Sequence, residues 1–334
     1  KMKSFENLKK IFLIAEIGNN HEGSYKNAIK LIDKAQASGV DAVKFQTFDT
    51  KNFINKLEKK RFSKLKSFEL SKKDFKKLYL YSKKKRLKFI STPFDFESAK
   101  FLSKIVDAFK ISSGDNNFFD LIKYCASFKK PLIISTGMLN LNEIKDILLC
   151  LDKIKFPRKK LAFLHCVSDY PAKDIEAILF SIKYLKDKLS VTIGYSDHVI
   201  GSESCIIAKS LGAKIIEKHF TLNNNFSNFR DHQIALNPED MQKMTSSIRR
   251  VEKMLGNYGK NITRSERKNY ATTRRSIYFS RNLKKGAVLK KPNYLISKFE
   301  YLFGEDQGRY LVEIDKNNLK DVIKILAENT VHYD

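Results

Sequence analysis

Two histidines, His198 and His219, are the residues whose type and spacing first suggest chemistry. Each follows a short apolar run, Ser190–Gly194 or Ala213–Ile216, with the composition of a buried strand. The intervening segment Cys205–Gly212 is typical of a helix that a glycine ends. In a parallel barrel, adjacent strand ends open at one mouth, so both imidazoles would meet there. The pair predicts part of a divalent-metal site; the alternative is two unrelated polar loop residues.

The elements that must position these histidines form a repeated alternation. Eight short apolar runs alternate with helical segments over about 250 residues, as in a (β/α)8 TIM barrel. The runs are Ile11–Ala15, Asp41–Gln46, Lys88–Ser91, Ala108–Ser112, Pro131–Ser135, Leu161–His165, Val191–Gly194 and Lys214–Glu217. A doubly wound sheet would have fewer strands and a glycine-rich nucleotide turn, and the sequence contains neither G-x-G-x-x-G nor a P-loop.

The helical segments are assigned from caps and glycine stops. Ser24 is expected to cap a helix that ends at Gly39, and a polar, lysine-rich insertion then runs to about Leu70. Further helices are expected at 72–85, 97–103, 118–127, 141–154, 175–184 and 238–255.

Every predicted strand ends in a polar or ionisable side chain, and in a barrel these side chains would converge on one face. In chain order they are Glu16, Asn19, Asn20 and His21; Lys44 and Gln46; Thr92; Lys110 and Ser113; Ser135 and Thr136; His165 and Tyr170; Ser196, Asp197 and His198; Glu217 and His219. Taken singly, each could be an ordinary loop residue. Together they predict a polar site at the mouth of the barrel.

Lys44 and Lys110 indicate the kind of ligand. A lysine at a buried strand end is stable only with an anionic partner. Two such lysines among short hydroxyls predict a phosphate site, and the hydroxyls are those of Thr92, Ser113, Ser135 and Ser196. The rival hypothesis is a Schiff-base lysine, which would need one desolvated amine. Glu16 and Glu217 are then candidates for proton transfer.

Composition bounds the function classes. The chain has 334 residues, 42% of them hydrophobic, and a formal net charge of +27. The lysines are dispersed over expected helices without a zinc-finger or aromatic RNA-binding signature, which favours a solvated surface over nucleic-acid binding. No membrane span or secretory segment is expected, and Cys125, Cys150, Cys166 and Cys205 suit reduced thiols in the cytoplasm.

Seven short motifs follow one another along the chain. They are Ala15–Gly23 (AEIGNNHEG), Lys44–Thr47 (KFQT), Ser91–Phe94 (STPF), Lys110–Gly114 (KISSG), Ser135–Met138 (STGM), Gly194–His198 (GYSDH) and Glu217–Thr221 (EKHFT). In this order they resemble the sialic acid synthases, which make N-acetylneuraminate, legionaminate and related nonulosonates. The resemblance implies that phosphoenolpyruvate condenses with an N-acylated hexosamine, such as N-acetylmannosamine or a 2,4-diacetamido-trideoxyhexose, to a nine-carbon 2-keto acid with release of phosphate. It also implies a divalent metal, manganese first and magnesium or cobalt as alternatives, that activates the sugar aldehyde.

The resemblance assigns roles by position. The metal ligands would be His198 and His219, and both would be catalytic together with Glu16 and Glu217. The phosphoenolpyruvate site would comprise Lys44, Thr92, Lys110, Ser113, Ser135 and Ser196. The sugar site would comprise Gln46, Asp115, Tyr170 and Asp231.

Three departures from the family pattern concern the barrel. Asp115 stands where many relatives carry glutamate, so its shorter carboxylate bears on sugar specificity. Ser168 replaces an asparagine near the phosphate, and Phe229–Arg230 replaces a Gly-Pro pair, which adds a cation near the sugar loop.

The C-terminal part departs further. We expect a catalytic barrel at 1–260, a linker at 261–273, a partial antifreeze-like segment at 274–299 and an atypical α/β segment at 300–334. Relatives form a homodimer in which that domain supplies an arginine to the partner's sugar site. Here the corresponding Arg-Pro-Gly is missing after Ile296, and Lys298 is the nearest substitute. The last 35 or so residues resemble the C-terminus of phosphoribosylformylglycinamidine synthase, with a strand expected at 309–315 and a helix at 318–329.

Two further functions stay open on the sequence alone. A catalytically impaired barrel could act as a binding module, because the C-terminal part is altered. A Schiff-base aldolase would use Lys44 or Lys110.

Overall fold

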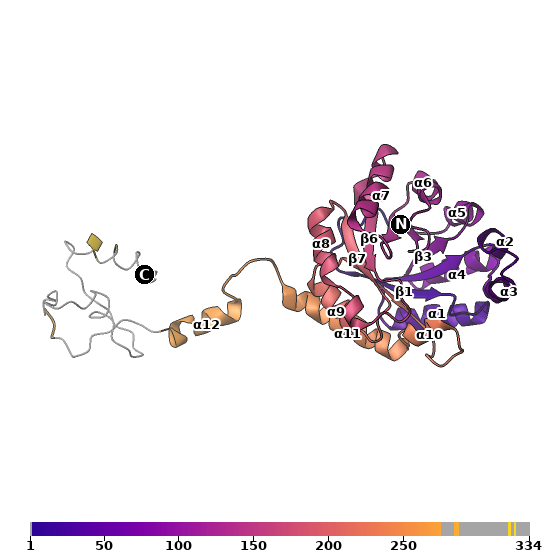
Figure 1. Cartoon of the computed structure of the whole chain (residues 1–334). Helices are drawn as coiled ribbons and strands as arrows, with labels where there is room; N and C mark the ends of the chain where they lie inside the picture. Colours follow the sequence, from indigo (N-terminus) through magenta and orange to yellow (C-terminus); the bar gives the residue numbers. More distant parts are fainter. Residues whose placement is uncertain (1, 275–283, 287–319, 322–323, 325–334) are drawn as a thin grey trace. The chain divides into compact units, whose positions relative to one another are not determined.

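A closed barrel of eight parallel strands forms the first of two compact units, residues 1–257. The computed structural model describes residues 2–274, 284–286, 320–321 and 324 (Figure 1). Each strand pairs in parallel with the next, and β8 closes on β1. The strands are β1 Phe12–Gly18, β2 Ala42–Thr47, β3 Lys88–Pro93, β4 Ala108–Ile111, β5 Leu132–Ser135, β6 Leu161–Cys166, β7 Thr192–Asp197 and β8 Ile215–His219. The predicted TIM barrel is confirmed.

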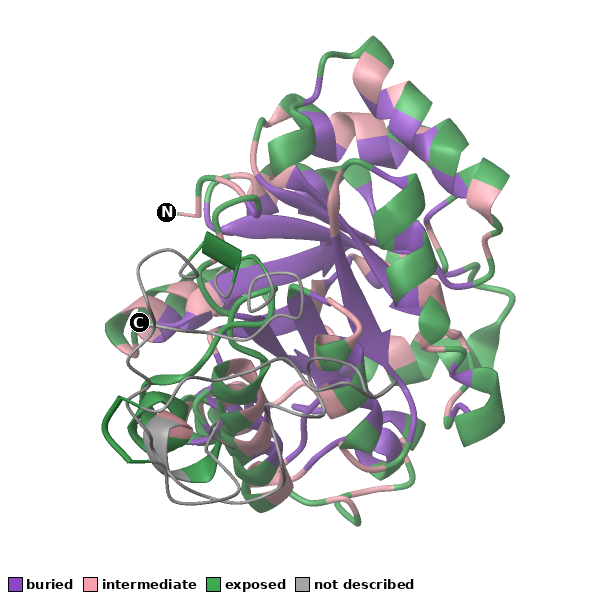
Figure 2. Ribbon diagram, turned by 90° about the vertical axis from the view of Figure 1, so that its left-hand side faces the viewer, coloured by how far each residue is buried: buried purple, intermediate pink, exposed green. Residues whose placement is uncertain are grey.

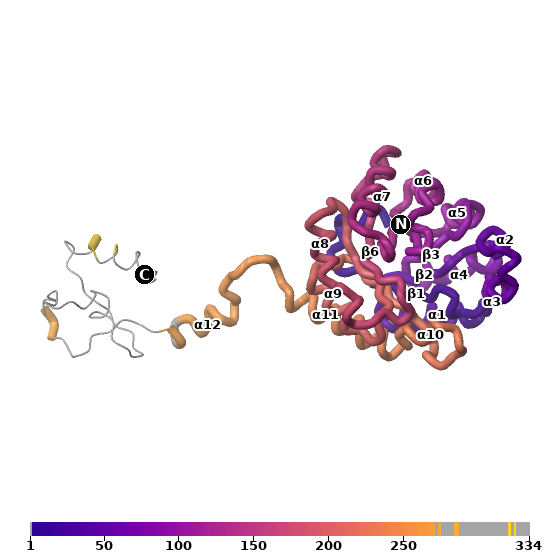
Figure 3. Tube along the Cα trace, in the orientation of Figure 1, coloured from indigo at the N-terminus to yellow at the C-terminus, as the bar shows by residue number. Residues whose placement is uncertain are grey.

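Helices surround the barrel in chain order, as the colours of Figure 3 show around the rim. They are α1 Tyr25–Ala37, α2 Thr50–Phe53, α3 Lys59–Phe68, α4 Lys72–Lys84, α5 Phe96–Leu102, α6 Phe119–Ser127, α7 Leu141–Lys153, α8 Phe180–Lys188, α9 Glu203–Ser210, α10 Arg230–Ile234 and α11 Pro238–Leu255. Short 3-10 turns lie at Arg158–Lys160 and Asp174–Glu176. Within the described part of the chain, no helix is long and apolar enough to cross a membrane.

Local signals explain most helix ends. Ser24 accepts a hydrogen bond from Asn27 N at the start of α1, and Gly39 follows its end with a φ of +81° that favours glycine. Asn237 caps α11, and Pro238 occupies its first turn. The helix expected at 175–184 is wrong in position, because Ile178 has a φ of +40° that interrupts the helical backbone, and α8 begins at Phe180.

The barrel has an inner and an outer apolar layer. Side chains alternate along each strand, so one set fills the barrel and the other packs under the helices. Figure 2 shows the strands as buried and the outer helix faces as exposed. The inner set includes Phe12, Ile14, Ala42, Ile90, Ala108, Ile133, Ala162, Leu164 and Ile215. Phe5, from the N-terminal segment, packs against this inner set.

The next inward position after this apolar layer carries a polar side chain on several strands. Glu16 follows Ile14 by two residues, Lys44 follows Ala42, and Lys110 follows Ala108. Ser135 and Glu217 occupy the same position after Ile133 and Ile215. Lys44, Lys110, Ser135 and Glu217 lie within the strands as predicted, whereas Glu16, expected just past the first strand, also lies within it because it pairs with both β2 and β8.

The second unit spans 258–334, and the structure describes little of it. The segment expected as a linker contains helix α12, Arg264–Thr273, which begins with a capping box formed by Thr263 and Glu266. Nearly all of the expected segments 274–299 and 300–334 lies outside the described residues, as does Lys298. The homodimer and the strand and helix expected there stay predictions.

Candidate active site

A cavity of about 770 Å³ opens at the carboxyl ends of the strands. All fourteen residues that the sequence assigned to a site line it: Glu16, Lys44, Gln46, Thr92, Lys110, Ser113, Asp115, Ser135, Tyr170, Ser196, His198, Glu217, His219 and Asp231. Their individual roles stay predictions. Their convergence follows from the parallel barrel, which turns every strand end toward the same mouth.

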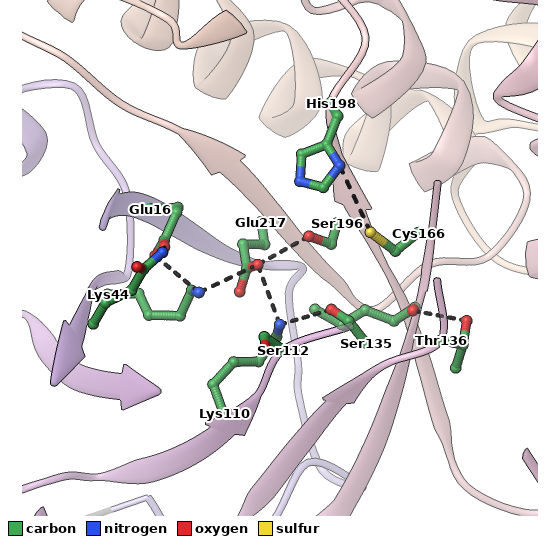
Figure 4. A network of polar contacts seen from close by, with 12 residues as sticks. Glu16, Lys44, Lys110, Ser112, Ser135, Thr136, Cys166, Ser196, His198 and Glu217 are labelled. Carbon is green, nitrogen blue, oxygen red and sulfur yellow. Dashed lines mark hydrogen bonds and ion pairs between the residues drawn. The ribbon is translucent and has the colours of Figure 1, made fainter. Parts of the chain in front are cut away.

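Four buried charges form the floor of the cavity (Figure 4). Lys44 Nζ lies 2.9 Å from Glu16 Oε2 and 3.6 Å from Glu217 Oε1. Lys110 Nζ lies 3.5 Å from the same Glu217 oxygen and donates to Ser135 Oγ at 2.6 Å. Glu217 therefore bridges the two lysines, and the floor is a compact array of two amines and two carboxyl groups.

Short hydroxyls surround this array. Ser196 Oγ donates to Glu217 Oε1 at 2.9 Å. The hydroxyls of Thr92, Ser113 and Ser168 are buried without a hydrogen-bond partner in the described structure. A Cβ on Gly137 would come within 2.6 Å of Ser113 Oγ and 2.2 Å of Ser168 Oγ, so a side chain at position 137 would displace the two hydroxyls that converge there. Buried unpaired hydroxyls are costly unless a ligand completes them.

Burial and neighbouring charge separate the two carboxylates. Burial raises the pKa of Glu16 to about 7, although Lys44 opposes the shift. Burial acts in the same sense on Glu217, but Lys110 and Lys44 outweigh it and lower the pKa of that carboxyl. At neutral pH Glu217 is ionised, whereas Glu16 exchanges its proton readily.

The lysines differ in a similar way. Burial lowers the pKa of Lys110, and the attraction of Glu217 only partly offsets it. For Lys44, burial is outweighed by Glu16 and Glu217, so its pKa is raised. Both amines are held in fixed positions at the floor.

The two predicted metal ligands lie side by side. His198 follows β7 directly and His219 ends β8, and their ring centroids are 5.4 Å apart. Burial lowers the pKa of His198 to about 4 and that of His219 well below its usual value, so both rings are neutral. His198 Nδ1 donates to Val167 O at 2.7 Å, which leaves Nε2 with a free lone pair.

These rings suit a divalent cation in part. His219 Nδ1 is buried without a partner, and both imidazoles are in the neutral form that a metal requires. No cluster of three or more His, Cys, Asp or Glu within the described ranges forms a metal site. The rings therefore fit an open site, in which oxygens of a substrate would complete the coordination.

Another side of the cavity carries amides and a stacked aromatic ring. Asn19 Nδ2 donates to Gln46 Oε1 at 2.8 Å, and Gln46 Nε2 contacts Glu16 Oε1 at 3.3 Å. The Tyr170 ring lies 4.0 Å from that of His198, and the guanidinium of Arg230 lies 4.5 Å from the Tyr170 ring.

Asp115 and Asp231 complete this side of the cavity. Burial raises the pKa of both carboxyls. Asp231 Oδ1 lies 3.5 Å from Arg230 Nε, and Asp115 accepts a hydrogen bond from Ser112 Oγ at 3.0 Å.

Sequence reasoning missed one wall of the cavity. The segment 50–70, expected only as a polar insertion, forms α2 and α3, and Phe53, Arg61, Lys64 and Leu65 from it line the cavity. Lys64 Nζ lies 5.0 Å from the Phe229 ring, which links this wall to the loop before α10. The spacing of Arg61 and Lys64 places them on one helix face, but nothing local says that this face turns inward.

Several polar residues near strand ends do not belong to the cavity. Asn20 donates to Phe220 O, His21 accepts from Gly23 N, and a ring nitrogen of His165 bonds Ala177 O. Asp197 pairs with Lys218 on the outer face of the strands. Each has a structural partner, so the expectation that all strand-end polar residues converge holds only for the inward set.

The chain is similar in sequence and in structure to known proteins. The NeuB family model matches residues 31–260. N,N'-diacetyllegionaminic acid synthase from Campylobacter jejuni is 39% identical over 300 residues, covering 86% of this chain and 90% of that protein. Pseudaminic acid synthase from the same species is 31% identical, covering 96% and 95%. The crystal structure of N-acetylneuraminic acid synthetase from Leptospira borgpetersenii in complex with citrate has a TM-score of 0.74 at 33% identity, covering 79% of this chain and 92% of that one.

Proposed function

The chain belongs to the NeuB family, and on this premise we propose that it condenses phosphoenolpyruvate with an N-acylated hexosamine. The product is a nine-carbon 2-keto sugar acid, and phosphate is released. The observation that carries the proposal is the buried pair Lys44 and Lys110 at the floor of the cavity, beside unpartnered hydroxyls. Two fixed cations and several short donors suit a small ligand with a phosphate and a carboxylate.

Glu16 is the group best placed to move protons. Its Oε2 contacts Lys44, on the phosphoenolpyruvate side, and its Oε1 contacts Gln46, on the acceptor side. Its pKa of about 7 allows it to give and to take a proton near neutrality. Glu217, held ionised by two lysines, is suited to fixing those lysines instead.

The reaction balances with Glu16 acting twice. As C3 of phosphoenolpyruvate bonds to the aldehyde carbon, protonated Glu16 gives its proton to the aldehyde oxygen, and C2 becomes electron-deficient. Ionised Glu16 then takes a proton from the water whose oxygen adds to C2. The C2–O bond to phosphate breaks, the C2 hydroxyl becomes the keto oxygen, and its proton leaves with phosphate. Glu16 ends protonated, as it began.

His198 and His219 are the residues that would hold the divalent metal, for which we propose manganese. A bound cation supplies a Lewis acid beside the sugar carbonyl. The chain's own contribution is to keep both rings neutral and to orient His198 through Val167 O.

For the acceptor we propose a hexose with two acetamido groups. The supporting observation is the 39% identity to the N,N'-diacetyllegionaminic acid synthase, whose name indicates a product with two acetyl groups. The amides of Gln46 and Asn19 and the carboxyls of Asp115 and Asp231 offer the polar contacts that such groups need. We place the reaction in the cytoplasm, a reducing compartment with which the four free thiols agree.

The test is phosphate release from phosphoenolpyruvate with Mn²⁺ against a panel of acceptors. The panel is N-acetylmannosamine, the 2,4-diacetamido-trideoxyhexoses of the legionaminate and pseudaminate series, and arabinose 5-phosphate as an unacylated control. We expect metal-dependent release with a diacetamido sugar, and none after His219→Ala. If no sugar of the panel causes phosphate release, the proposal is contradicted and a binding module is favoured. If borohydride with pyruvate labels a lysine, the proposal is contradicted and a Schiff-base aldolase is favoured.

A further inference from the structure

Behind the two histidines lies a buried ion pair that does not line the cavity. Lys218 Nζ is 2.7 Å from Asp197 Oδ2, and both side chains are fully buried. They lie in the outer layer, between strands β7 and β8 and helix α9. A buried ion pair is costly unless further hydrogen bonds satisfy both groups, so its surroundings decide what it does.

Asp197 is saturated with donors. Its Oδ1 accepts from Tyr195 OH at 2.8 Å and from Val199 N at 2.9 Å. Its Oδ2 accepts from Ser204 Oγ at 2.8 Å and from Cys205 Sγ at 3.2 Å, in addition to Lys218. Such a network fixes the carboxylate in one orientation.

The pair also holds the backbone around His198. Asp197 accepts from Val199 N, and Lys218 donates to Val199 O, so both polar groups of the residue after His198 are bound. These two hydrogen bonds fix the backbone of the turn that carries the His198 imidazole.

The position of the pair in the strands is decisive. Asp197 lies between Ser196 and His198, and Lys218 lies between Glu217 and His219. Because side chains alternate along a strand, these flanking residues turn to the opposite face, where all of them line the cavity. Asp197 and Lys218 are also the last paired residues between β7 and β8. The ion pair is therefore the cross-strand link nearest to both histidines on this face.

We propose that Asp197 and Lys218 are positioning residues that set the spacing and orientation of the His198 and His219 rings, and with them the affinity of the site for a divalent cation. The inference rests on the proposed function of the two histidines as metal ligands. Neither residue of the pair touches substrate. Partners that orient ligands typically change metal affinity about 10- to 100-fold when they are removed.

The main test is binding of Mn²⁺ alone, measured by calorimetry on the full chain. The double variant Asp197→Leu/Lys218→Met removes both charges together. This variant is chosen because replacing both members of a buried ion pair by apolar residues often leaves the protein stable. We expect its Mn²⁺ dissociation constant to rise about tenfold. The metal concentration for half-maximal phosphate release should rise in parallel, while saturating Mn²⁺ restores most of kcat.

The matched control is Lys83→Met. Lys83 Nζ lies 2.7 Å from the buried carboxylate of Asp107, which precedes β4 at the other end of the strand, away from the cavity. This variant should lower the unfolding temperature without changing Mn²⁺ affinity. If the double variant fails to fold, Tyr195→Phe and Ser204→Ala each remove one donor from Asp197 and should weaken Mn²⁺ binding by smaller factors.

The outcomes distinguish a failure of the positioning role of Asp197 and Lys218 from a failure of the proposed reaction. Unchanged Mn²⁺ affinity in the folded variants, an equal loss in Lys83→Met, or a wild-type chain that binds no Mn²⁺ would each overturn the inference. If the wild type binds Mn²⁺ but releases no phosphate with any sugar, the proposed reaction fails, and the Mn²⁺ comparison still decides the role of the pair.

Discussion

The floor and the rim of the cavity use charge in opposite ways. On the floor, Glu16, Lys44, Lys110 and Glu217 are each exposed by 4% or less and neutralise one another. At the rim, the side chains of Arg61 and Arg230 are 58% and 66% exposed. Buried charges act in a low dielectric and cannot reorient, whereas exposed charges are screened and mobile. The floor is therefore suited to the step common to all acceptors, and the rim to distinguishing among acceptors.

Removing a floor cation should have the largest effect. Lys110→Met deletes one of the two fixed cations and leaves Glu217 with less compensation. We expect kcat/KM for phosphoenolpyruvate to fall about 10³-fold, the scale found when a preorganised electrostatic group is lost. Steady-state phosphate release measures this. Lys153→Met, which changes an exposed lysine of α7, is the control, and an equal loss there would remove the distinction between floor and surface.

Glu16→Gln should separate binding from chemistry on the floor. We expect kcat to fall about 10²-fold, because proton transfer is lost. In the wild type, Glu16 must start protonated, and its pKa is about 7, so kcat/KM should decline as pH rises through 7.

The phosphoenolpyruvate anion should bind more tightly when Glu16 is protonated, because an ionised Glu16 would repel it. The affinity of the protein for phosphoenolpyruvate should therefore fall as the pH rises above 7. Glu16→Gln is neutral at every pH and should bind phosphoenolpyruvate without that dependence, as calorimetry at several pH values can show. Glu217→Gln is the comparison. It should lower the affinity for phosphoenolpyruvate in addition to kcat, because the neutral side chain no longer holds both lysines in place. The same pH dependence in wild type and Glu16→Gln would refute the assignment.

A rim cation should have the smallest effect and a different signature. Arg230→Ala removes a guanidinium that lies over Tyr170, and exposed contacts of this kind contribute ~1 kcal/mol. We expect KM for the acceptor to rise about fivefold, with KM for phosphoenolpyruvate unchanged. Arg158→Ala, at an exposed arginine that pairs with Asp152, is the control. A change in KM for phosphoenolpyruvate as large as that for the acceptor would mean that floor and rim are not separate.

Much of the floor could be predicted from the sequence. The eight short apolar runs predicted the strands of the barrel, and the polar residues at the ends of these runs predicted the site. The predicted strand ends were less accurate: β1 runs to Gly18 and not to Ala15, because Glu16 still pairs with both neighbouring strands and Gly18 pairs with Phe45 of β2. The rim could not be predicted in this way, because Arg61 and Lys64 look like any other lysine-rich helix face until α3 is placed against the mouth.

The sequence by itself determined the alternation of strands and helices, the residues at the strand ends and the resemblance that the comparisons confirm. It did so because periodicity and local caps are properties of neighbouring residues. Only the tertiary structure decided which face each of those residues takes. It turned Glu217 and His219 toward the cavity but Lys218 away from it, and it set the pKa of Glu16 apart from that of Glu217. Burial and cross-strand charge, which decide both, arise only when distant segments come together.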